Sequence, residues 1–305
     1  MSEETHGRLD LVSPRELARI ANLELVARGV VEGFLLGLHR SPYRGFSVEF
    51  AENRLYNPGD DTRFVDWKVY ARSDRLYIKQ YEEETNLRAH IVVDISRSMA
   101  WTSDPGRFVT KLDYSRMLAA SLALLLLRQG DAAGLLTFDD RPRDRVEPRA
   151  ALGQWRRLLN DLAAAHPGGR TDAGAVLTSL ARRLRRRGLV VLVSDLLVDP
   201  ASTRHALKLL RHQGHEALIF HVMDRAEMEL PAAGEATFYD PETGEELGTN
   251  SATLRRDYRE AVSEAIERWR RESLGMGVDY ALLTTDRPLG VALHRYLRGR
   301  IRRQR

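Results

Sequence analysis

The stretch Arg88-Ala-His-Ile-Val-Val-Asp94-Ile-Ser96-Arg-Ser98-Met99 decides the fold. It begins with apolar residues that predict a buried strand, and it then changes abruptly to a carboxylate and two hydroxyls on alternate positions. Similar apolar runs recur along the chain, and stretches with the spacing of amphipathic helices separate them. This alternation is typical of βαβ units, in which helices cover both faces of a mainly parallel sheet. The predicted fold class is therefore α/β, with a doubly wound, mainly parallel sheet.

The same pattern places the individual elements. Strands of the parallel sheet are predicted at residues 88–94, 131–138, 188–194, 217–223 and 278–284, with a short edge strand at 143–148. Helices are predicted at residues 111–128, 152–165, 172–187, 202–213, 252–273 and 289–302. Thr237 to Leu247 indicates a hairpin, inserted near residues 228–248 before the penultimate helix.

Upstream of residue 87 the sequence has a different texture. Glu16 to Leu38 carries apolar residues mostly three or four positions apart, which predicts a helix. Ser41 to Glu84 is rich in Gly, Pro and aromatic residues and predicts short strands joined by turns. We therefore divide the chain into residues 1–86, an N-terminal helix with a small β-rich segment, and residues 87–305, the main α/β domain.

Composition excludes several classes of protein. The 305 residues are 43% hydrophobic and include no Cys, so disulfides, thiolate metal sites and cysteine nucleophiles are absent. The longest uncharged apolar run, Met117 to Leu127, is much shorter than the roughly 20 residues of a membrane span. The N-terminal residues show neither a basic leader nor an apolar stretch. We therefore expect no membrane span and a cytoplasmic location.

Arginine dominates the basic residues, with 43 Arg among 47 Lys plus Arg. One cluster, residues 182–187, lies at the end of a predicted helix, where cations suit the helix dipole. A second cluster lies in residues 295–305 and supports an alternative hypothesis, a nucleic-acid-associated protein. That hypothesis predicts affinity that falls steeply with salt and is lost when residues 298–305 are deleted.

Polar side chains follow the predicted strands at the edge where ligands bind in parallel sheets. Asp94, Ser96 and Ser98 follow the first strand, Thr171 precedes a helix, and Asp195 follows a third strand. These oxygen donors suit Mg²⁺, with Mn²⁺ as the alternative. Because few donors are anionic, the ion would keep an open position for a partner's Asp or Glu. The competing structural interpretation is that these residues are turn and cap residues, with Thr171 as an N-cap.

This arrangement resembles the von Willebrand factor A domain, whose metal-ion-dependent adhesion site has the pattern Asp-x-Ser-x-Ser, then Thr, then Asp. The resemblance covers roughly residues 88–305 and implies that Ser96 and Ser98 ligate the metal directly, Thr171 directly or through water, and Asp94 and Asp195 mostly through water. Leu196 departs from the family pattern, because Gly often follows the last Asp.

A second resemblance spans most of the chain. The string Arg54-Leu-Tyr-Asn-Pro-Gly-Asp-Asp-Thr-Arg-Phe-Val-Asp-Trp67, followed by Ala71-Arg72 and Glu84, is similar to the signature of domain of unknown function fifty-eight. Members of this bacterial family are often encoded beside MoxR-type AAA+ ATPases, so the resemblance implies an adaptor or chaperone-like partner of such an ATPase. The tentative partner-binding residues are Asp60, Asp61, Arg63, Asp66 and Trp67; the alternative is a structural turn anchored by Trp67.

The sequence contains neither a phosphate-binding Gly-x-x-x-x-Gly-Lys-Ser/Thr loop nor a convincing dinucleotide fingerprint. We therefore expect a non-enzymatic, metal-dependent protein-interaction module. A Mg²⁺-dependent hydrolase is a weaker alternative, since His166 is the only candidate general base near the three loops.

Overall fold

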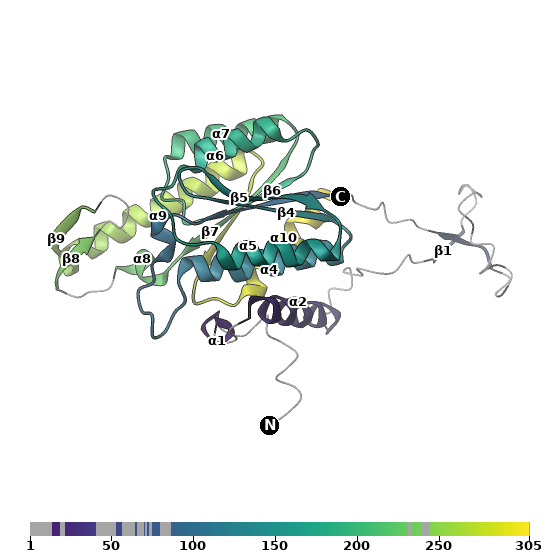
Figure 1. Cartoon of the computed structure of the whole chain (residues 1–305), viewed down its shortest axis with the longest axis horizontal. Coiled ribbons are helices and arrows are strands. Elements are labelled where there is room, and N and C mark those ends of the chain that lie inside the picture. The colour runs from purple at the N-terminus through teal and green to yellow at the C-terminus, as the bar shows by residue number, and fades with distance from the viewer. Residues whose placement is uncertain are drawn as a thin grey trace, which may run out of the picture.

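A six-stranded sheet lies at the centre of the structure (Figure 1). The computed structural model describes residues 14–18, 22–40, 53–56, 65, 70, 72, 75–79, 87–230, 234–239 and 244–304. The strand order is β10-β7-β6-β3-β4-β5, and all neighbouring pairs are parallel except β4 and β5. The strands are β3 (Arg88–Asp94), β4 (Ala132–Phe138), β5 (Pro142–Arg149), β6 (Leu189–Ser194), β7 (Glu216–Met223) and β10 (Asp279–Thr284). The predicted α/β fold with a mainly parallel sheet is confirmed.

Helices cover both faces of this sheet (Figure 1). One face carries α4 (Lys111–Arg128), α5 (Leu152–Ala164) and α10 (Leu289–Gln304), and α2 (Leu23–Arg40) packs outside α4. The other face carries α6 (Ala173–Arg183), α7 (Pro200–His212) and the C-terminal half of α9 (Ser251–Gly275). The shorter elements are α1 (Pro14–Ala18), β1 (Asn53–Leu55), β2 (Tyr77–Lys79), the 3₁₀ helix η4 (Arg97–Ala100), α8 (Arg225–Glu229), β8 (Glu235–Tyr239) and β9 (Glu246–Asn250).

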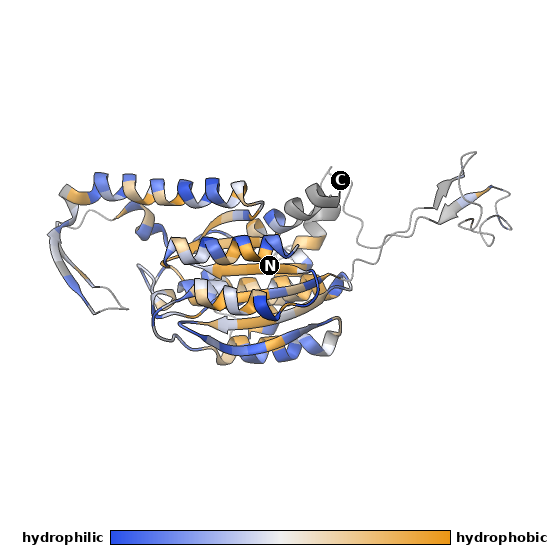
Figure 2. Cartoon of the chain, turned by 90° about the horizontal axis from the view of Figure 1, so that it is seen from above, coloured by the Kyte–Doolittle hydropathy of each residue, from blue (hydrophilic) through white to orange (hydrophobic). Residues whose placement is uncertain are grey.

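Strand β3 shows why the sheet is covered twice. Its side chains alternate between the faces, so Ile91 and Val93 join the core beneath α4, whereas Val92 joins the core beneath α6 and α7. The inner strands β3, β4, β6 and β7 are accordingly mostly hydrophobic, as Figure 2 shows, whereas the edge strand β5 is rich in charged residues. Among the described helices, none combines the length and the apolar composition that crossing a bilayer requires.

Two predicted helices differ from the structure. The helix predicted at residues 16–38 is α1 followed by α2, and the Asn22 side chain accepts the Glu24 N–H at 2.8 Å, which caps the start of α2. The helix predicted at residues 172–187 ends at Arg183, because Leu184 has an extended backbone that leads into β6. Only Arg182 and Arg183 of the arginine cluster therefore lie in its last turn.

The hairpin of β8 and β9 stands beside the N-terminal half of α9, away from the sheet (Figures 1 and 2). Phe238 and Tyr239 on β8 and Leu254 on α9 are exposed, whereas Ile266 and Trp269 in the second half of α9 are buried. The long helix therefore anchors the hairpin to the sheet domain.

Candidate metal-binding site at the carboxyl edge of the sheet

Four parallel strands end in buried carboxylates. Asp94 ends β3, Asp139 follows β4, Asp195 follows β6, and Asp224 follows β7; none of the four is more than 3% exposed. Because the carboxyl ends of parallel strands meet at one edge, these acids share one side of the molecule. Our sequence analysis used Asp94 and Asp195 but missed Asp139 and Asp224. A similar signal, an Asp at or just after the end of a largely apolar run, marks all four positions.

Asp94, Ser96 and Ser98 form a tight turn at the end of β3. The Ser96 N–H donates to Asp94 Oδ1 at 2.9 Å, and the hydroxyl oxygens of Ser96 and Ser98 lie 3.1 Å apart. The turn continues into η4, where the Met99 N–H donates to the Ser96 carbonyl at 3.1 Å. All three side chains are buried, so the structure brings the first three predicted site residues together.

Two further hydroxyls surround Asp94. Thr171 Oγ1 and Ser194 Oγ both donate to Asp94 Oδ2, at 3.1 and 2.7 Å. The residue that caps α6 is Asp172, whose side chain accepts the Ala175 N–H, so the interpretation of Thr171 as the cap is wrong. Thr171 instead faces the predicted site, and Ser194 is a neighbour that the motif did not include.

The Asp94 carboxyl group has no cationic partner among the described residues. Within the described part of the chain, its hydrogen bonds come from hydroxyls and an amide, and no Lys, Arg or His pairs with it. Complete burial, together with the negative charge of Asp195, raises the pKa of the Asp94 carboxyl to about 7. An ionised Asp94 is therefore unfavourable until a cation arrives.

Asp195, in contrast, already has a cationic partner. The Lys111 ammonium lies 2.8 Å from Asp195 Oδ2 and 2.5 Å from Glu227 Oε1, and only 1% of the Lys111 side chain is exposed. Burial alone would raise the pKa of Asp195, but the Lys111 charge outweighs it and holds that pKa below its usual value. Burial raises the pKa of Glu227 despite the ammonium. The sequence analysis missed both Lys111 and Glu227.

Asp139 holds the loop that carries Thr171. Its carboxylate accepts the Gly169 N–H at 3.1 Å and binds the Arg143 guanidinium, whose Nε lies 2.7 Å from Oδ1. Gly168 lies so close that an added methyl group would collide with the same carboxylate. The loop is therefore fixed to the end of β4, and Thr171 is directed at Asp94 from there.

The backbone after Asp195 is unusual. Leu196 has φ of 56°, in the left-handed region that favours glycine, and its side chain is buried. Leu196 is the residue that departs from the von Willebrand factor A pattern, and its backbone has the conformation that glycine would adopt without strain. The Leu197 N–H donates to Asp195 Oδ1 at 3.2 Å. Leu197 and Trp101 are 60% and 40% exposed and provide apolar surface on two loops of this edge.

The donor set fits a small hard cation. Ligands at neighbouring corners of a Mg²⁺ octahedron are about 3 Å apart, because each lies about 2.1 Å from the ion. The Ser96–Ser98 and Thr171–Asp94 oxygen pairs, each 3.1 Å apart, have this spacing. Among the described residues, no three His, Cys, Asp or Glu side chains could hold a metal by themselves.

The other predicted residues either lie outside the described residues or make no contact with this site that the structure describes. Asp60, Asp61, Arg63, Asp66 and Trp67 lie outside the described residues. The backbone of the arginine-rich C-terminus continues α10 to Gln304, and its side chains after Tyr296 lie outside the description. His166, the candidate general base, is exposed, and among the described residues no hydrogen bond joins it to Asp94 or Asp195.

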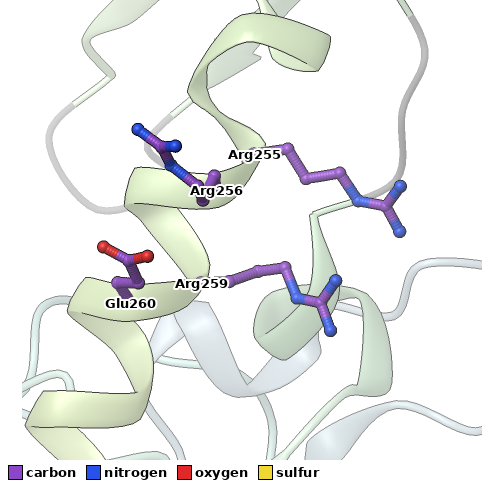
Figure 3. Close-up of a pocket in the computed structure, with 4 residues that line it drawn as sticks. All are labelled: Arg255, Arg256, Arg259 and Glu260. Atoms are coloured by element: carbon purple, nitrogen blue, oxygen red, sulfur yellow. The ribbon is translucent and has the colours of Figure 1, made fainter.

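A basic hollow of about 400 Å³ lies on α9 beside α8. Arg255 and Arg259 extend side by side from one face of the helix, while Arg256 and Glu260 extend from another (Figure 3). Arg255 Nε donates to the Glu229 carbonyl at 3.3 Å, which joins α9 to the end of α8. This surface is basic, whereas the sheet edge is acidic.

The sequence pattern of a family described as "Protein of unknown function DUF58" matches residues 52–268. The chain belongs to the DUF58 family. Uncharacterised proteins of Mycobacterium bovis (Mb1516) and Mycobacterium tuberculosis (Rv1480) are each 30% identical to it over 300 residues, which cover 97% of this chain and 93% of theirs. The resemblance to domain of unknown function fifty-eight is confirmed.

Similar solved structures include the conserved hypothetical protein BatB of Bacteroides thetaiotaomicron. That match has a TM-score of 0.49 and 15% identity, and it covers 70% of this chain and 98% of BatB. The VWA domain of SpRpn10 matches with a TM-score of 0.37 and 13% identity, over 67% of this chain and 92% of that one.

Proposed function

We propose that this DUF58 protein is a metal-dependent protein-interaction module, in which Asp94, Ser96, Ser98, Thr171 and Asp195 hold Mg²⁺, with Mn²⁺ as the alternative. The observation that carries the proposal is the buried Asp94 carboxylate, which hydroxyls surround and no cation of the described chain neutralises. Burying a charge without a partner costs free energy, so a buried carboxylate of this kind is consistent with a bound cation that compensates its charge.

The residues of the site have separate roles in this proposal. Ser96 and Ser98 offer hydroxyl oxygens at ligand spacing, and Thr171 offers a third from the loop that Asp139 fixes. Asp94 and Asp195 supply negative charge from two strands. When bound, the metal supplies an open coordination position for a carboxylate oxygen of a partner protein. Trp101 and Leu197 would give that partner apolar contacts beside the metal.

The partner that we propose is a MoxR-type AAA+ ATPase, for which this protein would act as an adaptor or chaperone-like subunit. The support is the resemblance of residues 54–94 to a family often encoded beside such ATPases. No enzymatic activity is proposed, since His166 is exposed and makes no hydrogen bond to the site within the described chain.

Calorimetric titration of the metal-stripped protein with Mg²⁺ and Mn²⁺ tests the metal site. We expect saturable binding that Asp94→Ala abolishes while circular dichroism shows both proteins folded. Asp257→Ala is the matched control, because Asp257 is an exposed residue of α9 that contacts only its neighbour Arg256 among the described residues. Absence of metal binding by the wild-type protein would overturn the proposal.

A pull-down tests the partner. The MoxR-type ATPase from the same genome should bind the immobilised protein in Mg²⁺ but not in EDTA, and it should not bind Asp94→Ala. Equal capture in Mg²⁺ and in EDTA would show that any association does not use the metal site.

A further inference from the structure

We infer that Lys111 is the permanent cation of this site. Its ammonium pairs with the Asp195 carboxylate before a metal binds, and it competes with the metal for that carboxylate. It also lowers the negative charge of the metal-loaded site, so that a partner's carboxylate can bind. This inference rests on the proposed function and assigns the residue that sets its metal affinity and its preference for an anion.

The position of Lys111 is fixed at both ends. Its backbone N–H donates to the Trp101 carbonyl at 3.3 Å where α4 begins, and its ammonium lies between Asp195 Oδ2 and Glu227 Oε1. Only four of the 47 basic residues of the chain are Lys, so a Lys at this buried place stands out. The compact ammonium fits between two carboxylates from different elements, whereas a guanidinium fork binds one carboxylate with two nitrogens.

Lys111 also joins the site to α8. Glu227 Oε2 accepts the Asp224 N–H at 2.8 Å, and the Asp224 carboxylate accepts the Ser103 N–H at 3.0 Å. The ammonium therefore anchors α8 and the loop after η4 as well as Asp195. These contacts link three elements at the edge of the sheet through Lys111.

The formal charges explain what the ammonium does for binding. Counted formally over the two acids of the proposed metal site and the acid that shares Lys111 with Asp195, that is without Asp224, Asp94, Asp195 and Glu227 contribute three negative charges and Lys111 one positive charge, which sum to −2. A divalent cation brings this sum to zero. Without Lys111 the loaded site would keep a charge of −1 and would repel a second carboxylate. The same ammonium opposes metal binding, because it repels the ion and occupies Asp195 Oδ2.

Lys111→Met separates these two effects. We expect this variant to bind Mg²⁺ about tenfold more tightly than the wild type in calorimetry at about pH 8, since no ammonium repels the ion. Lys208→Met is the matched control, because it removes the same charge from the exposed face of α7, and its affinity should equal that of the wild type. Unchanged or weaker Mg²⁺ binding by Lys111→Met would overturn the inference.

A carboxylate probe tests the second effect. Fluoroacetate, followed by the broadening of its ¹⁹F NMR signal in saturating Mg²⁺, should bind the wild type and Lys208→Met but bind Lys111→Met several-fold more weakly. Equal broadening by all three proteins would overturn the charge argument.

A second variant covers the case in which Lys111→Met fails to fold without metal. Lys111→Met/Glu227→Gln removes the ammonium together with one of its two carboxylates and leaves the net charge unchanged. We expect it to fold and to bind Mg²⁺ more tightly than the wild type, because Asp195 is released. Weaker binding by this folded double variant would count against the inference.

Failure of the inference differs from failure of the proposed function. If the wild type binds Mg²⁺, Asp94→Ala does not, and Lys111→Met binds like the wild type, the metal site stands and the role of Lys111 falls. If neither the wild type nor the Lys111 variants bind Mg²⁺, both fall. Binding by Lys111→Met alone would overturn the proposed function and with it the inference, since the ammonium would then exclude the metal from the wild-type site.

Discussion

Asp94 ends β3, and Asp139 follows the neighbouring strand β4, one residue beyond the position opposite Asp94; both side chains are fully buried. Burial would raise the pKa of each carboxyl, but hydrogen bonds from Arg143 and from the Gly169 N–H hold the pKa of Asp139 below its usual range. Asp94 has no such cation among the described residues, and its pKa rises to about 7. One strand end is thus a completed ion pair that fixes a loop, and the next lacks its cation. Burial alone does not distinguish a structural acid from a binding acid, whereas the counter-ion does.

The largest loss of stability should come from breaking the ion pair between Asp139 and Arg143. Asp139→Ala removes the acceptor of the Arg143 guanidinium and of the Gly169 N–H, and we expect it to lower the free energy of unfolding by about 3 kcal/mol in urea denaturation. It should also release the loop of Thr171 and so weaken Mg²⁺ binding. Asp140→Ala, at an exposed acid 3.4 Å from the same guanidinium, should cost less than about 0.5 kcal/mol. Similar losses in both variants would mean that burial of Asp139 contributes nothing.

Removing the charge of Asp94 should have the opposite effect, a gain in the stability of the metal-free protein. Asp94→Asn keeps the shape of the side chain but removes the unneutralised charge, so we expect the metal-free protein to gain about 1–2 kcal/mol at about pH 8. In saturating Mg²⁺ the order should reverse, because only the wild type gains binding free energy. Thermal unfolding in EDTA and in Mg²⁺ measures both. A loss of stability in EDTA, comparable with that of Asp139→Ala, would remove the distinction between the two acids.

The pH ranges over which Asp139 and Asp94 change the stability of the protein should also differ. The folded-state pKa of Asp139 lies below its unfolded value near 3.8, so its contribution is present above about pH 4 and is lost as pH falls further. The folded-state pKa of Asp94 lies above its unfolded value, so ionising it costs stability as pH rises from about 4 to 7. Urea midpoints of wild type and Asp139→Ala should therefore converge below about pH 4. Those of wild type and Asp94→Asn should diverge between about pH 4 and 7.

The sequence was sufficient to predict the sheet and to predict that four residues of the proposed site lie close together. Apolar runs with helical stretches between them predicted the parallel strands, because a strand buried on both faces needs apolar residues throughout. Asp94, Ser96, Ser98 and Thr171 could be found because each follows a strand or precedes a helix at the ligand-binding edge. Hydrogen bonds through Asp94 and between the two serines show that the structure brings these four together.

The cationic partners of Asp195 and Asp139 could not be predicted in the same way. Lys111 lies 84 residues from Asp195 and 116 residues from Glu227 in the chain, so no local spacing relates them. It is the first residue of the apolar helix α4, where a lysine is ordinarily solvated. Arg143 lies on an edge strand rich in charge, and nothing in the order of residues marks it as the partner of Asp139. Pairing of charges depends on packing between strands, which periodicity does not record.

The smallest effect concerns the backbone after Asp195. Leu196 has a left-handed backbone, so a side chain there costs about 1 kcal/mol that glycine avoids. Removing its buried side chain destabilises Leu196→Gly and Leu196→Ala alike. The glycine variant should nevertheless be more stable than the alanine variant by about 1 kcal/mol, the reverse of the usual order. Urea denaturation of the two variants side by side measures this difference.

Ile95 is the matched position, because it follows Asp94 as Leu196 follows Asp195 and it is also buried, with no left-handed backbone. Ile95→Ala should therefore be more stable than Ile95→Gly by about 0.5–1 kcal/mol, because glycine loses more backbone entropy on folding. The same order at both positions would mean that the turn after Asp195 relaxes when its side chain shrinks. Opposite orders would mean that Leu196 is kept for its buried contacts against the preference of its own backbone, so that this strand end remains rigid where Asp195 meets Lys111.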